Sequence, residues 1–81
     1  MNIKLFGSAD CAGCVVVKQL LTVNGVAFEY FDVMHHADME TASKYGIRGI
    51  PTVVVERDGV EHFFTGSTKP TVDSLLLHIG V

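Results

Sequence analysis

The chain has 81 residues, of which 48 % are hydrophobic and 19 % are charged, a composition that suits one small domain, residues 1–81, with a packed core. The net charge of −3 at pH 7 argues against a nucleic-acid binder, which normally carries a basic patch. The longest apolar runs are far shorter than the roughly 20 residues that cross a membrane, so we expect neither a nucleic acid nor a membrane as a partner.

The N-terminal half of the sequence predicts a strand, a helix and a second strand. Residues 2–6 alternate polar side chains that should face outward with apolar ones that should face inward, which is typical of a strand. Residues 11–23 predict a helix that stops at Asn24–Gly25, and residues 26–33, rich in aromatic and β-branched side chains, predict the second strand. The apolar residues at helical spacing in this first helix are Val16, Leu20 and Val23.

The C-terminal half predicts a helix, a hairpin of two strands and a last helix. Residues 38–45 are polar helix formers that open with an acidic residue and are followed by glycine. Residues 52–56 and 60–65 are two strands joined by an Asp-Gly turn. The last helix begins near Pro70 and ends at Gly80. Its apolar stripe consists of Val72, Leu75, Leu76 and Ile79.

The predicted order of elements, β-α-β-α-β-β-α, belongs to the α/β class. The first two strands are joined through a helix, so they should lie parallel with a right-handed crossover. The last two strands should form an antiparallel hairpin. We therefore expect a central mixed four-stranded sheet flanked by three helices, with helices on both faces.

Two cysteines lie three positions apart where the first strand gives way to the first helix. The sulfur of Cys11 should face the unpaired N–H groups and the positive end of the helix dipole, which both favour the nucleophilic thiolate. Cys14 lies one helical turn further on the same face, so it can form a disulfide with Cys11 or attack a mixed disulfide there. Ala12 and Gly13 are small and leave Cys11 open to a bulky protein disulfide. The pair therefore favours redox chemistry.

Other interpretations of the two cysteines stay open at this point. A zinc site usually has four ligands, and the chain has no second cysteine pair. The histidines are poorly spaced to complete one, because His35 and His36 are adjacent while His62 and His78 are isolated. A structural disulfide over so short a loop restrains little chain entropy. Two inert buried cysteines are the remaining alternative.

A second motif, residues 44–52, places Pro51 directly before a predicted strand. Proline cannot donate a hydrogen bond to a sheet ladder, so Pro51 marks an edge or a special turn. Cis peptide bonds occur almost only before proline, which makes Ile50–Pro51 a candidate for one. A trans proline in a loop is the ordinary alternative for this segment alone.

Taken together, these motifs resemble the thioredoxin superfamily. Residues 46–52, Gly-Ile-Arg-Gly-Ile-Pro-Thr, look like the cis-proline loop of thioredoxins and stand downstream of a Cys-x-x-Cys, with matching element order. The short length and the early cysteines are similar instead to glutaredoxins and the small glutaredoxin-like thioredoxins. The resemblance implies a thioredoxin-like fold over essentially the whole chain.

By this resemblance, Cys11 is the attacking thiol and Cys14 the resolving thiol. Pro51 should be cis and lie against the cysteine pair, and the backbone of Ile50 should pair with an extended substrate segment. Gly66 stands where the family keeps a glycine beside the active site, which lets a partner's backbone come close. The family chemistry needs no cofactor beyond the two thiols.

The resemblance implies a dithiol–disulfide oxidoreductase that reduces protein disulfides, with an NADPH-dependent reductase as electron donor. Glutaredoxins grip glutathione partly through an acidic residue at the start of the last helix, where this chain has Lys69. We therefore favour a thioredoxin-reductase-type donor, as in the redoxins that feed ribonucleotide reductase. The alternatives are a glutathione-dependent glutaredoxin, an exported oxidant or isomerase, and a non-catalytic metal or iron–sulfur carrier that uses the two thiolates.

Two departures from thioredoxins concern the chemistry of the thiols. The buried acid that thioredoxins place six residues before the first cysteine is Leu5 here. Asp10 directly precedes Cys11, and an exposed acid there opposes thiolate formation. We therefore expect a thiol pKa at Cys11 that is less depressed than in strongly oxidising relatives.

Location and assembly are expectations from composition alone. The N-terminus shows no apolar signal core with a cleavage site after it, and a cysteine pair in a cytosolic protein is more often catalytic or metal-binding than structural. We therefore expect a cytoplasmic monomer, while a signal segment removed beforehand would leave the same sequence.

Overall fold

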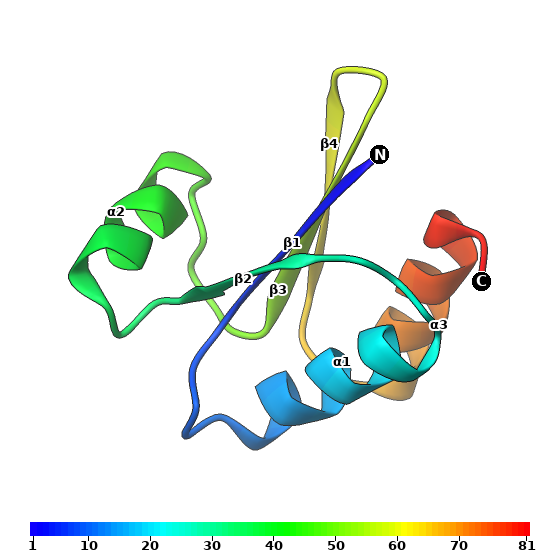
Figure 1. The fold of residues 1–81 in the computed structure, drawn as a ribbon, viewed down its shortest axis with the longest axis horizontal. Helices are drawn as coiled ribbons and strands as arrows, with labels where there is room; N and C mark the ends of the chain where they lie inside the picture. Colours follow the sequence, from blue (N-terminus) through cyan, green and yellow to red (C-terminus); the bar gives the residue numbers. More distant parts are fainter.

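The computed structural model describes residues 1–81 and contains four strands and three helices (Figure 1). The elements are β1 (Asn2–Gly7), α1 (Ala12–Val23), β2 (Glu29–Asp32), α2 (His36–Lys44), β3 (Thr52–Arg57), β4 (Val60–Thr65) and α3 (Lys69–Ile79). This is the predicted β-α-β-α-β-β-α order. No helix has both the length and the apolar character needed to cross a membrane.

The four strands form one mixed sheet in the order β2-β1-β3-β4. Strand β1 pairs in parallel with β2, with Leu5 opposite Tyr30, and pairs antiparallel with β3, with Leu5 opposite Val53. Strands β3 and β4 form the antiparallel hairpin. The predicted thioredoxin-like sheet is confirmed, and β1 and β3 occupy its centre.

Helices cover both faces of the sheet, with α1 and α3 together on one side and α2 on the other (Figure 1). The larger core, on the α1 and α3 side, contains Ile3, Leu5, Val17, Leu21, Val53, Val55, Val72 and Leu75. The smaller core, under α2, contains Phe6, Ala42 and Val54. Burying one such aliphatic or aromatic side chain contributes about 1.5–3 kcal/mol, so most of the stabilisation comes from the α1 and α3 side.

The predicted apolar face of α1 is wrong in its rotation. The helix buries Cys14, Val17 and Leu21 against the sheet, whereas Val16 is 45 % exposed and Val23 is 77 % exposed. Three consecutive valines offer two alternative stripes, and the pattern alone cannot choose between them. The close approach of Cys14 to Gly7 of β1 decides the rotation.

Two element boundaries also differ from the prediction. Strand β2 covers only Glu29–Asp32 because it is an edge strand that pairs with β1 alone. Helix α2 begins at His36, two residues early, since the turn before it is already ordered. In that turn, Asp32 accepts a hydrogen bond from the Met34 N–H at 2.9 Å, and the Asp38 carboxylate accepts one from the Asp32 N–H at 3.0 Å.

Lys4 was expected to face outward, yet α2 and the neighbouring strand cover much of it. Its Nζ donates to Glu56 Oε1 at 3.0 Å, and the Tyr45 hydroxyl donates to the same oxygen at 2.7 Å. These hydrogen bonds, from Tyr45 first and then from Lys4, lower the pKa of Glu56. The three side chains tie β1, β3 and the end of α2 together.

A pH-dependent loss of stability is expected from His78 on α3. Its Nε2 is buried without a hydrogen-bond partner, and its ring centre lies 4.4 Å from that of His62. Burial, and then the nearby His62 and Arg57, hold the pKa of His78 below its ordinary value of 6.5. Below pH 6.5, His78 therefore binds a proton in the unfolded chain but stays neutral in the native state. The contribution of neutral His78 to the free energy of unfolding is complete above pH 6.5, and it is lost as the pH falls below that value.

Urea unfolding measured between about pH 7.5 and pH 5.5 checks this expectation. The His78→Gln variant should lose most of the pH dependence in this range. His36→Gln should keep it, because His36 is exposed on α2. Equal slopes for His78→Gln and the unsubstituted protein would contradict the assignment.

Candidate redox site

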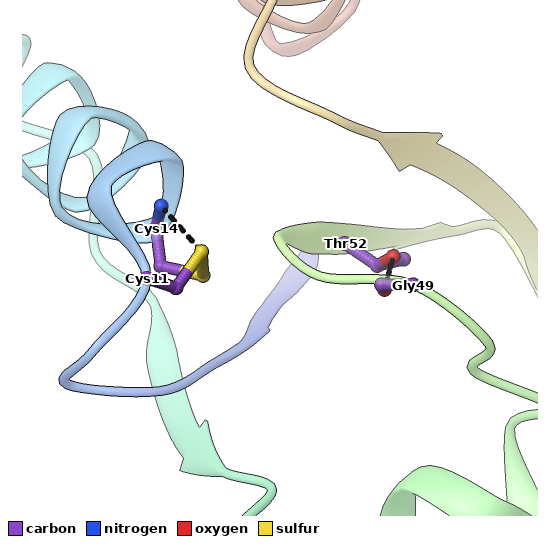
Figure 2. The surroundings of a disulfide bond; sticks show 4 residues. All are labelled: Cys11, Cys14, Gly49 and Thr52. Carbon is purple, nitrogen blue, oxygen red and sulfur yellow. Dashed lines mark hydrogen bonds between the residues drawn. A yellow bond between two sulfur atoms is a disulfide. The ribbon is translucent and has the colours of Figure 1, made fainter.

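A disulfide joins Cys11 and Cys14 at the start of α1, with 5.2 Å between the two Cα atoms (Figure 2). Cys11 is the N-cap of the helix and has extended backbone angles, with φ −101° and ψ 110°. Cys14 belongs to the first turn. A short loop, residues 8–11, connects the end of β1 to this turn, so the central strand of the sheet positions the cysteine pair.

The start of α1 directs a backbone N–H group at the sulfur of Cys11. The backbone N–H of Cys14 donates to Cys11 Sγ at 3.2 Å, and the first turn contains no acidic residue. A thiolate at the N-cap gains from this N–H group and from the helix dipole. Asp10, which directly precedes the helix, is exposed to solvent.

The two sulfurs differ in accessibility. Cys14 is only 2 % exposed, whereas Cys11 is half-buried and its neighbour Ala12 is exposed. A bulky disulfide can therefore reach Cys11 and not Cys14. The exposed Val15 and Val16 of α1 continue this accessible surface.

The loop before β3 faces the disulfide (Figure 2). Its Ile50–Pro51 peptide bond is cis, which is what the resemblance implies. Pro51 is buried, and its carbonyl accepts a hydrogen bond from the Gly66 N–H at 2.8 Å. The Thr52 hydroxyl donates to the Gly49 carbonyl at 2.6 Å. These bonds fix the loop beside the cysteines.

Gly13 and Gly66 occupy positions where a side chain would disturb the site in different ways. A Cβ on Gly13 would stand 3.1 Å from Ser67 Cβ and 3.4 Å from Pro51 Cδ, so a side chain there would crowd the start of α3. Gly66 has φ +104°, a conformation that other residues rarely adopt, while the space beside it is open. Its conformation, and not crowding, requires a glycine there.

Ile50 presents unused backbone groups beside the disulfide. Its N–H and C=O take part in no backbone hydrogen bond, and its side chain is half-buried. An extended segment can therefore pair with it without displacing any existing bond.

Two residues of the site were not predicted from the sequence. Ser67 packs against Gly13, where its Oγ lies 2.6 Å from the point that a Cβ on the glycine would occupy. Gly7 ends β1 directly beneath Cys14, and a Cβ there would stand 2.9 Å from Cys14 Sγ. The contact of Ser67 with Gly13 joins segments that are distant in sequence, whereas Gly7 and Cys14 lie only seven positions apart. A glycine at the end of a strand was the only local indication.

The start of the last helix carries a positive charge. Lys69, at the first position of α3, is exposed and pairs with Asp73 at 2.7 Å.

No group of three or more His, Cys, Asp or Glu side chains comes close enough together to hold a metal ion. A metal carried by the two thiolates would therefore need ligands from outside this chain.

Comparison with protein families gives a match to the model described as Glutaredoxin over residues 3–60. No curated protein sequence matches the chain. Among solved structures, the thioredoxin-like protein BC3987 is 34 % identical, with 93 % of this chain and 100 % of that chain covered and a TM-score of 0.71.

Two thioredoxins show the same fold at lower identity. A mutant thioredoxin from Halobacterium salinarum is 26 % identical, with a TM-score of 0.78. The match covers 95 % of this chain and 69 % of the thioredoxin chain. The thioredoxin of Fasciola hepatica is 24 % identical, with a TM-score of 0.70. The match covers 94 % of this chain and 77 % of the thioredoxin chain.

Proposed function

Because the chain belongs to the glutaredoxin family, within the thioredoxin superfamily, we propose that it reduces disulfide bonds of other proteins through Cys11 and Cys14. Thiol–disulfide oxidoreduction is the activity that the fold and the Cys11–Cys14 disulfide support in general. The proposal adds the substrate class, the role of each thiol and the electron donor.

The observation that carries the proposal is the unequal exposure of the two sulfurs beside an unpaired backbone edge. Cys11 is reachable and Cys14 is not, while Ile50 offers a free N–H and C=O next to them. An extended protein segment that pairs with Ile50 would bring its own disulfide to Cys11. A protein disulfide fits this arrangement better than a small thiol, which needs no strand pairing.

The reaction proceeds in two exchanges. The thiolate of Cys11 attacks one sulfur of the substrate disulfide, forms a mixed disulfide and releases the other substrate sulfur as a thiolate, which takes a proton from water. Cys14 then attacks Cys11 Sγ, which forms the Cys11–Cys14 disulfide and releases the second substrate thiol. Two electrons pass to the substrate, and a reductase must return them.

A thioredoxin-reductase-type enzyme is the proposed donor. Lys69 carries the wrong charge to hold the amino group of glutathione at the start of α3, and the bulky Ile50 stands beside the cis proline. Proteins that receive electrons from this chain would include ribonucleotide reductase, by the resemblance to redoxins that supply it. The match to the Glutaredoxin model favours glutathione as the second candidate donor.

The deciding experiment follows NADPH consumption with a protein disulfide as the acceptor. The chain is coupled in parallel to thioredoxin reductase and to glutathione with glutathione reductase. We expect turnover with thioredoxin reductase and little with glutathione. Turnover mainly with glutathione would overturn the proposed donor and leave the roles of the thiols intact.

A charge-reversed variant sharpens this test. Lys69→Glu introduces an acidic group at the start of α3 and should raise the glutathione-dependent rate by about threefold to tenfold, the range of one charged contact. Lys44→Glu, at an exposed position on α2, is the matched control and should leave that rate unchanged. An equal rise in both variants would show a general charge effect instead.

A further inference from the structure

A second group of residues meets on the β2 side of the disulfide. Cys14 lines a cavity of about 420 Å³, and the other titratable residues that line it are Lys18 of α1 and Tyr30 and Asp32 of β2. None of these three has a role in the reaction described above. Cys14 therefore shares this cavity with two charged side chains and a phenol.

The ring of Tyr30 lies near both Lys18 and Cys14. Cys14 Sγ and Tyr30 Cε1 stand 2.9 and 3.6 Å from the point that a Cβ on Gly7 would occupy, so the sulfur and the ring both lie beside this glycine. Lys18 Nζ lies 4.6 Å from the centre of the same ring. Lys18 also follows Cys14 by four positions, which places both on one face of the helix. A cation–π contact therefore places the ammonium over a ring that borders Gly7, on the helix face that also carries Cys14.

The other charged residue that lines the cavity is Asp32. Burial, and then Asp32, raise the pKa of Tyr30, so its phenol stays neutral at neutral pH. The Asp32 carboxylate is engaged in the following turn, where Oδ1 accepts from the Met34 N–H at 2.9 Å and Oδ2 lies 4.0 Å from His35 Nε2.

We propose that Lys18, held in place by the ring of Tyr30, stabilises the thiolate of Cys14 and thereby speeds the resolution of the mixed disulfide, an inference that rests on the proposed function. In this step the Cys14 thiol gives its proton to water. The thiolate attacks Cys11 Sγ, the Cys11–Cys14 bond forms, and the bond from Cys11 to the substrate sulfur breaks. The substrate cysteine leaves with that electron pair as a thiolate.

A titration of Cys14 alone tests the inference without any substrate. In a Cys11→Ser background, the ultraviolet absorbance of the thiolate reports Cys14. Adding Lys18→Met should raise the titration midpoint by about half a pH unit to one unit, because an opposite charge is lost. Lys18→Arg should restore the midpoint, and Lys44→Met should leave it unchanged.

A single-turnover measurement then connects the charge to the reaction. Release of substrate from a mixed disulfide at Cys11 should be about threefold to tenfold slower in Lys18→Met at neutral pH. The difference should vanish at alkaline pH, where the thiol is ionised in both proteins. A merely structural role of Lys18 would slow release at every pH.

The two readouts separate the inference from the proposed function. Equal titration midpoints in Lys18→Met and Lys44→Met overturn the role of Lys18. A shifted midpoint in a protein that fails to reduce protein disulfides supports that role and overturns the proposed function. Tyr30→Leu serves as a second variant, since it removes the ring and should shift the midpoint in the same direction as Lys18→Met.

Discussion

Cys11→Ser should abolish protein-disulfide reduction, with a loss of about a thousandfold or more, because a serine hydroxyl is a far weaker nucleophile than a thiolate at neutral pH. Cys14→Ser should behave differently. Cys11 stays reachable at the N-cap of α1 in this variant, so it still attacks the substrate. Without the resolving thiol, the product is a stable mixed disulfide.

Mass spectrometry after incubation with a protein disulfide distinguishes the two variants. Cys14→Ser should gain the mass of one substrate chain, which a reducing agent removes, and Cys11→Ser should gain none. Val23→Ser, an exposed change at the far end of α1, serves as the control and should turn over normally. Trapping by Cys11→Ser would reverse the assigned roles of the two thiols.

Gly7→Ala should destabilise the fold by about 1–3 kcal/mol, the usual range for overpacking a filled site. The added Cβ would stand 2.9 Å from Cys14 Sγ and 3.0 Å from Cys14 Cβ, closer than such atoms normally come. Neither side can yield easily, because β1 is a central strand and Cys14 belongs to the first turn of α1. Turnover should fall as well, since the cysteine pair must shift.

Urea unfolding gives the stability, and a double-mutant cycle identifies the cause. Gly7→Ala should cost less in a Cys14→Ala background, where the sulfur is absent. The matched control is Gly49→Ala, whose Cβ would meet only Thr65 Cγ2 at an ordinary 3.5 Å. An unchanged cost in the Cys14→Ala background would mean that the sulfur is not the source of the strain.

The order of the elements and the position of the cysteine pair could be predicted because each depends on local sequence. The cysteine spacing, the Asp-Gly turn and the segment before Thr52 each specify a short stretch of backbone. The rotation of α1 was predicted wrongly, since it depends on the contact between Gly7 and Cys14.

Contacts across the sheet explain the other differences. Strand alternation placed Lys4 on the correct face, but no local pattern shows that α2 would cover that face and pair Lys4 with Glu56. The packing of Ser67 against Gly13 likewise joins the start of α3 to the start of α1. Such pairings are decided by the whole fold.

The unequal size of the two cores gives the molecule unequal local stability. Helix α2 has nine residues and buries only Ala42, so its backbone amides should exchange with solvent through local opening. The amides of β1 and β3 should exchange only when the whole chain unfolds. Since α2 leads directly into the cis-proline loop, its opening would loosen one wall of the redox site while the disulfide turn keeps its shape.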